Sequence, residues 1–321
     1  MKRLNPLVPF LERNDAVILD GALATELERR GADLVDPLWS AKTLIERPEL
    51  IRQVHYDYFV AGADVATTAT YQATPQGFAR RGLSAGETGE LLNLGIRLAL
   101  EARDDFWAVA ANRRDRLRPL VAASIGPYGA YLADGSEYSG DYGLERSALI
   151  EFHRQRFAVL ADSEADLLAC ETIPTLIEAE ALVALLDKHP QAVGWLSFSC
   201  GDGTRLHHGE TLAEAATLAA ACDQVLAVGV NCTAPRLITS LLLSAGGVTA
   251  KPLVVYPNSG EGWDAVHRCW LPGADRRPLQ DYVREWFGAG ARLIGGCCRT
   301  TPEDIRQIRL ALLRSAETAR P

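Results

Sequence analysis

The sequence contains no apolar run long enough to cross a membrane, and no segment of it has the pattern of a secretory signal. The first six residues carry positive charge, but no long apolar segment follows them. Both a signal peptide and a transmembrane helix require such a segment. We therefore predict a cytoplasmic protein with no membrane partner.

Positive charge is also scarce. The chain has 33 lysine and arginine residues against 41 aspartate and glutamate residues, a formal net charge of −8. Proteins that bind nucleic acids usually present a basic surface, so we predict no nucleic-acid partner. The basic cluster at residues 113–116 is short and includes an acidic residue, which is typical of a solvated surface.

Several other signals are missing. The chain has no GxGxxG or Walker pattern, and the Gly-Pro-Tyr-Gly segment at residues 126–129 is not a phosphate-binding loop. No linker rich in serine and glycine divides the chain, so residues 1–321 are predicted to form a single domain. The seven cysteines are an odd number in a chain without a secretory signal. This favours metal binding or thiol chemistry over a disulfide framework.

Short apolar runs recur along the 321 residues, of which 48% are hydrophobic. Eight runs occupy residues 16–20, 64–68, 119–124, 166–171, 194–199, 226–231, 252–256 and 292–296. Such runs suit strands buried on both faces of a parallel sheet. Amphipathic, helix-like segments lie at residues 48–61, 144–161, 175–188, 212–221 and 302–314. Eight strand–helix alternations predict a (β/α)8 TIM barrel, although a doubly wound sheet shares the alternation. The longest loops are expected at residues 71–91 and 126–143.

Active sites of such barrels lie at the carboxyl ends of the strands. In chain order, these ends carry Asp20, Thr67 and Thr68, Ser124, Glu171, Cys200, Asn231 and Cys232, Asn258 and Ser259, and Cys297 and Cys298. Carboxylates and cysteines are therefore predicted to converge on one mouth of the barrel. Asp20 and Glu171 each have a plain interpretation as helix caps. Together they would hold an ammonium group well.

The strongest local signal is the sequence Gly295-Gly296-Cys297-Cys298. Successive strand side chains point to opposite faces, so two adjacent cysteines can share a metal only if the chain turns there. Glycine accepts the unusual backbone angles of such a turn. With Cys232 as a third thiolate, three protein sulfurs would bind the metal and leave its fourth coordination position open, as in catalytic zinc sites. Two alternatives stay open, namely buried cysteines acting as small apolar side chains and a strained redox pair of adjacent cysteines.

The remaining cysteines and the histidines carry weaker signals. Four cysteines are interpreted as small apolar side chains: Cys170, Cys200, Cys222 and Cys269. Two adjacent histidines in a polar loop are predicted to be solvated: His207 and His208. Two others fall within helical patterns and are predicted to be surface or hydrogen-bonded core residues: His55 and His153.

Longer motifs are spread over nearly the whole chain. They occupy residues 19–27 (LDGALATEL), 38–41 (LWSA), 70–74 (TYQAT), 124–138 (SIGPYGAYLADGSEY), 169–172 (ACET), 229–232 (GVNC), 256–261 (YPNSGE) and 295–302 (GGCCRTTP). In these motifs the sequence resembles the homocysteine S-methyltransferases. It is most similar to the branch that takes its methyl group from S-methylmethionine.

The resemblance implies a zinc ion at the barrel mouth, held by Cys232, Cys297 and Cys298. The sulfur of L-homocysteine would take the fourth zinc position as a thiolate. It would then attack the methyl group of S-methyl-L-methionine in line, with S-adenosylmethionine as an alternative donor. The negative thiolate and the positive sulfonium neutralise each other in the transition state, and a site that excludes water favours this loss of charge.

The resemblance also implies how the substrates are held. Asp20 and Glu171 would bind the homocysteine amine, and backbone amides near Gly21 and Ala22 would bind its carboxylate, as a helix N-terminus does. Aromatic faces suit the sulfonium cation of the donor. Four aromatic residues lie in segments predicted above the mouth: Trp39, Tyr71, Tyr128 and Tyr131. Some of these are equally well explained as packing residues, Trp39 above all.

Other questions are left open by the sequence. The C-terminal oligomerisation extension of the betaine-using relatives is not present, so their oligomeric state is not implied. A different barrel enzyme, such as a thiol-dependent lyase, would not need all three cysteines. A zinc-binding protein without catalysis would bind metal but form no methionine. An assay of methionine formation discriminates among these classes.

Overall fold

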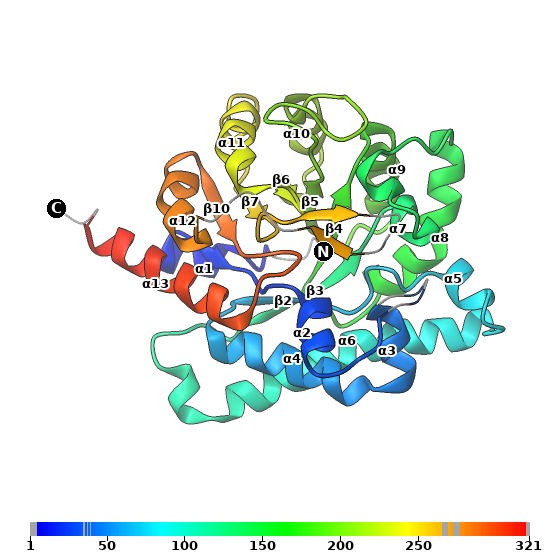
Figure 1. Cartoon of the computed structure of the whole chain (residues 1–321), viewed down its shortest axis with the longest axis horizontal. Helices are drawn as coiled ribbons and strands as arrows, with labels where there is room; N and C mark the ends of the chain where they lie inside the picture. The colour runs from blue at the N-terminus through cyan, green and yellow to red at the C-terminus, as the bar shows by residue number, and fades with distance from the viewer. Residues whose placement is uncertain are drawn as a thin grey trace.

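An eight-stranded parallel sheet, surrounded by helices, forms the centre of the molecule (Figure 1). This computed structural model describes residues 5–34, 36, 38, 40–264, 269–271 and 277–318. The strand order is β1-β10-β7-β6-β5-β4-β3-β2, and a parallel bridge between Leu19 and Val65 joins the two edge strands. The Asp20 amide also donates to the Val65 carbonyl at 3.0 Å. The sheet therefore closes on itself, and the predicted TIM barrel is confirmed.

All eight predicted apolar runs form strands of the barrel. These are β1 (Val17–Ile18), β2 (Val65–Thr67), β3 (Leu120–Ile125), β4 (Leu167–Ile173), β5 (Gly194–Phe198), β6 (Val225–Asn231), β7 (Leu253–Tyr256) and β10 (Ala291–Ile294). A two-stranded antiparallel sheet of β8 (Gly262–Asp264) and β9 (Cys269–Leu271) lies between β7 and β10 in the chain. These two short strands were not predicted.

One helix precedes the first strand, and the others alternate with the strands along the chain. The helices are α1 (Val8–Asn14), α2 (Leu23–Arg29), α3 (Ser40–Glu46), α4 (Pro48–Ala61), α5 (Pro75–Ala79), α6 (Ala85–Ala108), α7 (Tyr128–Leu132), α8 (Arg146–Ala161), α9 (Leu176–Leu186), α10 (Leu212–Ala220), α11 (Ile238–Gly246), α12 (Leu279–Gly288) and α13 (Pro302–Thr318). Short 3-10 helices occur at η1 (Ala110–Arg113), η2 (Ser136–Tyr138) and η3 (Pro235–Leu237). The five predicted helices are confirmed within a few residues at each end.

The two segments predicted as long loops contain helices. Residues 71–91 include α5 and the first turns of α6, and residues 126–143 include α7 and η2. The start of α6 has a physical cause that the sequence contains. The Ser84 hydroxyl accepts from the Glu87 amide at 3.3 Å, and the Glu87 carboxylate accepts from the Ser84 amide at 2.8 Å. This reciprocal capping satisfies amides that the first helical turn leaves free.

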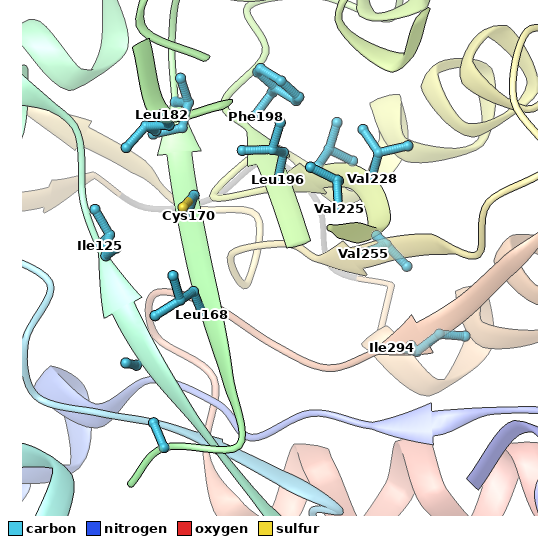
Figure 2. Close-up of a cluster of buried hydrophobic side chains, with 14 of the residues drawn as sticks. Ile125, Leu168, Cys170, Leu182, Leu196, Phe198, Val225, Val228, Val255 and Ile294 are labelled. Atoms are coloured by element: carbon cyan, nitrogen blue, oxygen red, sulfur yellow. The ribbon is translucent and has the colours of Figure 1, made fainter. Parts of the chain in front are cut away.

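Alternate strand residues build two apolar layers, as the pleat of a strand requires. Val17, Leu19, Leu167 and Ala169 belong to the cluster inside the barrel. Their neighbours in sequence belong to the cluster between the sheet and the helices. Figure 2 shows part of this outer layer, with Leu168 and Cys170 of β4 and Leu182 of α9. Burial on both faces explains why the strands read as continuous apolar runs.

The N-terminal segment packs against the interior of the barrel. Leu7 and Phe10, at the start of α1, are 0% and 3% exposed and belong to the inner cluster. None of the helices in the described ranges is both long and apolar enough to span a bilayer.

Candidate active site

A cavity of about 270 Å³ lies at the carboxyl ends of the barrel strands. Residues that end five different strands line it: Thr68, Ser124, Glu171, Cys232 and Cys297. Four other predicted strand-end residues do not line it: Asp20, Cys200, Asn258 and Ser259. The cavity therefore collects most, though not all, of the polar residues expected at the barrel mouth.

Three cysteine sulfurs meet in this cavity. Those of Cys232, Cys297 and Cys298 all lie within 4.8 Å of one another. The Cys232 and Cys298 sulfurs are 3.6 Å apart, and Cys232 is joined to Cys297 as a disulfide, with Cα atoms 5.6 Å apart. Within the described ranges, no other group of three histidine, cysteine or acidic side chains is placed to hold a metal.

The cluster fits zinc once the disulfide is reduced. Sulfurs bound tetrahedrally to zinc at about 2.3 Å lie roughly 3.8 Å apart, close to the 3.6 Å between Cys232 and Cys298. Burial raises the pKa of the Cys298 thiol to about 12, and the Glu137 carboxylate adds to the effect. A bound cation is therefore needed if this sulfur is to be a thiolate at neutral pH.

The chain turns immediately after Cys297, as two adjacent cysteine ligands require. The Thr300 amide donates to the Cys297 carbonyl at 3.1 Å, and Arg299 has a left-handed φ of 68°. The prediction that Gly295 and Gly296 supply unusual backbone angles is wrong, because neither has a positive φ. Their lack of a side chain matters instead, since a Cβ at Gly296 would lie 2.4 Å from Thr300 Oγ1.

Asn231, the last residue of β6, supports the cysteine cluster. Its Nδ2 donates to Thr172 Oγ1 at 2.7 Å and lies 3.9 Å from the Cys297 sulfur. Its Oδ1 accepts from the Thr172 amide at 2.7 Å and the Ser197 hydroxyl at 2.8 Å. These contacts fix the side-chain amide with an N–H near sulfur, as the groups that surround a metal site commonly do. The sequence predicted that Asn231 lies at the barrel mouth but gave it no role, because its hydrogen-bond partners belong to other strands and are not adjacent to it in sequence.

Glu171 is a buried carboxylate in the cavity wall. It is 8% exposed, and the hydroxyls of Ser124 and Tyr256 donate to it. Burial raises its pKa to about 7, and the two hydroxyls offset part of this rise. Glu171 is therefore readily protonated when no cation is near and ionised when one is bound.

Asp20 is buried next to the cavity rather than in its wall. It is 3% exposed and accepts from the amide of Thr67 at 2.8 Å and from its hydroxyl at 3.0 Å. Thr67 itself lines the cavity, whereas Asp20 does not. Burial raises the pKa of Asp20 to about 8, and the nearby charge of Glu171 contributes to the rise.

Gly21 and Ala22 both line the cavity, as their predicted role requires. The amide of Ala22, the N-cap of α2, donates to Thr300 Oγ1 at 3.2 Å. That amide is therefore already engaged, while the first-turn amides of α2 have no partner within the helix. A Cβ at Gly21 would lie 2.8 Å from Thr300 Oγ1 and 2.9 Å from the Tyr58 ring.

The four predicted donor-side aromatics are placed differently from one another. Tyr71 lines the cavity. Tyr128 and Tyr131 do not; their rings pack against Phe152 of α8, with centroids 4.8 and 5.4 Å apart. The geometry gives these two tyrosines a packing role, because they lie three residues apart on α7 and so share the face toward α8. Trp39 lies outside the described residues.

Two further cavity residues come from η2, in a segment predicted as loop. They are Glu137 and Tyr138. The motif at residues 124–138 contains both, but spacing alone gives no reason to place them in the cavity. Tyr138 also meets the ring of His207 edge-on at 5.5 Å between centroids, so His207 packs against the site rather than standing free in solvent.

The remaining predictions concern residues away from the cavity. His153 is buried and within 2.8 Å of Glu178, which confirms a hydrogen-bonded core residue. For His55 the prediction is wrong, because the side chain is buried and neither ring nitrogen has a hydrogen-bond partner in the described part of the chain. Burial lowers the pKa of His55 to about 4. Nδ1 of His208 lies 3.1 Å from Glu210 on the surface loop. Cys170, Cys200 and Cys222 are buried, as expected. The side chain of Cys269 lies outside the described part of the structure.

Comparison with known proteins agrees with this geometry. The family model described as homocysteine S-methyltransferase matches residues 17–312. The homocysteine S-methyltransferase YbgG of Bacillus subtilis is 51% identical over 98% of this chain and 100% of its own length. Crystal structures of the homocysteine methyltransferase MmuM from Escherichia coli, in metallated and oxidized forms, each have a TM-score of 0.86 and 49% identity. They cover 95% and 96% of this chain and 99% of theirs. The chain therefore belongs to the homocysteine S-methyltransferase family.

Proposed function

We propose that this protein transfers a methyl group from S-methyl-L-methionine to the thiol of L-homocysteine and so forms two molecules of methionine. The proposal rests on one observation above all, which is that three cysteine sulfurs and the Glu171 carboxylate share one cavity. Family membership supports homocysteine as the acceptor. The motif resemblance supports a sulfonium donor, with S-adenosylmethionine as the alternative.

We propose zinc as the metal, with Cys232, Cys297 and Cys298 as its ligands. Bound zinc would lower the pKa of a substrate thiol enough to deprotonate it at neutral pH without a general base. The sulfur-only ligand set and the 3.6 Å separation of two of the sulfurs support this choice. Asn231 would hold Cys297 in its ligating orientation through the 3.9 Å contact.

The acceptor would bind through its amino acid end. Its ammonium group would sit against Glu171, with the buried charge of Asp20 close by. Its carboxylate would meet the first-turn amides of α2, beside Gly21. Paired carboxylates hold an ammonium through charge-assisted hydrogen bonds, each worth roughly 1.5–3 kcal/mol.

The methyl transfer itself is a single displacement. The homocysteine thiolate donates an electron pair to the methyl carbon, and the old carbon–sulfur pair stays on the donor sulfur as a neutral thioether. The thiol proton has already passed to solvent. Because a negative and a positive charge cancel, a site that excludes water favours the reaction. Tyr71 and Tyr138, which line the cavity, would cover the reacting sulfurs.

The test is a comparison of methyl donors. Zinc-loaded protein is incubated with homocysteine and with S-methylmethionine, S-adenosylmethionine or betaine, and methionine is quantified. We expect the highest kcat/KM with S-methylmethionine and the lowest with betaine. A protein that works best with betaine would overturn the donor assignment. A protein that binds zinc and homocysteine but forms no methionine from any donor would overturn the function.

A further inference from the structure

We propose that Glu137 recognises the sulfonium charge of the methyl donor and thereby selects cationic donors over neutral molecules of the same shape. The inference rests on the proposed function, because it assigns a residue to the donor half of the same cavity. Glu171 and Asp20 are already occupied by the acceptor in that scheme, so the donor cation needs its own counter-charge.

The backbone around Glu137 is held firmly in place. The Ser199 hydroxyl donates to the Glu137 carbonyl at 3.1 Å. Gly129 of α7 lies so close that a Cβ there would be 2.4 Å from the Glu137 nitrogen. The side chain is therefore presented to the cavity, which it lines, from a fixed position.

The Glu137 carboxylate has no protein partner for one of its oxygens. Oε2 is buried and makes no hydrogen bond within the described part of the chain. Burial raises the pKa of Glu137 to about 7, and the charge of Asp134 adds to the rise. A buried carboxylate oxygen without a donor is costly, and a cationic ligand would remove that cost.

The composition of the cavity wall supports a cationic ligand. Four acidic residues line it: Glu28, Asp36, Glu137 and Glu171. Asp36 is paired with Arg81, so the other three are the acids that can face a cationic ligand. Among the described lining residues there is no lysine, arginine or histidine. Such a wall attracts cations and raises their local concentration.

The position of Glu137 favours the sulfonium over the donor's ammonium group. Glu137 lines the same cavity as the sulfurs of Cys297 and Cys298, so the carboxylate faces the space in which the methyl group is transferred. The sulfonium has to approach this cluster for its methyl group to be transferred, whereas the ammonium lies at the other end of the donor. Tyr71 and Tyr138, whose pKa values the Glu137 charge raises, would frame the same cation with their rings.

A contact with the sulfonium predicts a particular kinetic pattern. The positive charge is complete in the bound donor and is lost as the methyl group is transferred. Glu137 therefore stabilises the ground state more than the transition state, and it would lower KM without raising kcat. Replacing it should raise the donor KM while leaving kcat unchanged or higher.

The experiment compares the charged donor with a neutral isostere. 2-Amino-5-methylhexanoate has a CH group where S-methylmethionine has its sulfonium sulfur, so the two molecules share shape, ammonium and carboxylate. In Glu137→Gln we expect the S-methylmethionine KM to rise tenfold or more, which corresponds to about 1.4 kcal/mol or more. The inhibition constant of the isostere against the donor should change less than twofold. Glu137→Asp retains the charge and should recover part of the loss.

Asp134→Asn provides the matched control. Asp134 lies on the same loop, is exposed and accepts from the Ser136 amide at 3.0 Å, a contact that asparagine can keep. Removing this charge should leave the donor KM, the isostere constant and the homocysteine affinity within twofold of the parent.

Several results would overturn the inference. One is an unchanged donor KM in Glu137→Gln, and another is an equal rise in the isostere constant, which would mean that Glu137 shapes the pocket or binds the ammonium. If the parent forms no methionine from S-methylmethionine, the proposed function fails by itself. Calorimetric binding of S-methylmethionine to the parent and to Glu137→Gln then decides this inference. Binding that is weakened only in the variant supports it, and equal or absent binding in both overturns it.

Discussion

Replacing Asp20 with asparagine should stabilise the fold and weaken homocysteine binding at the same time. Asparagine fits the site, because its Oδ1 can accept from the Thr67 amide while its Nδ2 donates to the Thr67 hydroxyl. The aspartate makes these contacts at 2.8 and 3.0 Å. The substitution therefore removes a buried charge with little change of shape. Its effects on stability and binding follow from that charge alone.

The size of the stability effect follows from the pKa of Asp20. Burial raises it from 3.8 to about 8, so between these values the folded chain keeps a proton that the unfolded chain releases. The free energy of unfolding of the parent then falls as pH rises and levels off above the folded pKa. At about 1.36 kcal/mol for each pH unit, the loss from about pH 5.5 to about pH 8.5 is on the order of 3 kcal/mol.

The Asp20→Asn variant lacks this titrating group, so its free energy of unfolding should not show this pH-dependent decrease. Its advantage over the parent in the free energy of unfolding should therefore begin near the unfolded pKa of 3.8, reach roughly 2 kcal/mol by about pH 5.5, and grow by about a further 3 kcal/mol toward pH 8.5. Denaturant unfolding at several pH values measures the difference. Asp162→Asn, at a side chain that is 78% exposed, is the control and should show no growing advantage. An Asp20→Asn advantage that is independent of pH would refute the argument.

The same variant should bind homocysteine tenfold or more weakly, because a charge-assisted contact is worth roughly 1.5–3 kcal/mol. At neutral pH the free parent holds protons on Asp20 and Glu171, whose pKa values are about 8 and about 7. An arriving ammonium should release them. Calorimetry in buffers of different ionisation enthalpy should detect this proton release, and Asp20→Asn should reduce it. Equal affinity and equal proton release in both proteins would make Asp20 a purely structural residue.

Further predictions concern the metal cluster and the donor. Cys298→Ala should lose most bound zinc and nearly all activity while the fold survives, whereas Cys222→Ala, a buried cysteine outside the cavity, should keep both; metal analysis and methionine assay decide. Gly296→Ala should weaken zinc binding, because its Cβ would press on Thr300 at 2.4 Å, and unchanged zinc affinity would contradict this. Tyr71→Leu should raise the donor KM by up to about 30-fold, the equivalent of roughly 2 kcal/mol of cation–aromatic contact, with homocysteine affinity unchanged.

The fold was predictable because burial on both faces of the sheet requires apolar residues, and runs of apolar residues can be recognised in the sequence. A strand covered on both faces is mainly apolar along its length, and all eight strands were recognised from such runs. The helices hidden in the long loops show what such patterns omit. The start of α6 depends on a capping pair, Ser84 and Glu87, rather than on apolar spacing. Helix α7 is only five residues long, too short to show a period.

The candidate site was predictable where chemistry depends on residue type and not where it depends on direction. The cysteine cluster followed from three thiols at the carboxyl ends of two strands, β6 and β10, which β7 separates in the barrel. The sequence could not tell which aromatic residues line the cavity, because the direction of a ring depends on what it packs against. Tyr128 and Tyr131 turn toward Phe152 of α8, whereas Tyr138, a few residues later, lines the cavity. Nothing in the spacing of these tyrosines distinguishes the two outcomes.

One property unites the residues of the cavity, which is a group of buried acids with no basic side chain among the described residues of the cavity wall. Glu171 and Glu137 line the cavity, Asp20 lies beside it, and burial raises the pKa of each. Three cysteines add sulfurs that carry charge only when a cation is present. Each proposed ligand brings a positive charge to one of these groups: a zinc ion to the cysteines, an ammonium group to Glu171 and Asp20, and a sulfonium group to Glu137. Buried acids that destabilise the empty fold at neutral pH are therefore the same groups that would bind these three cations.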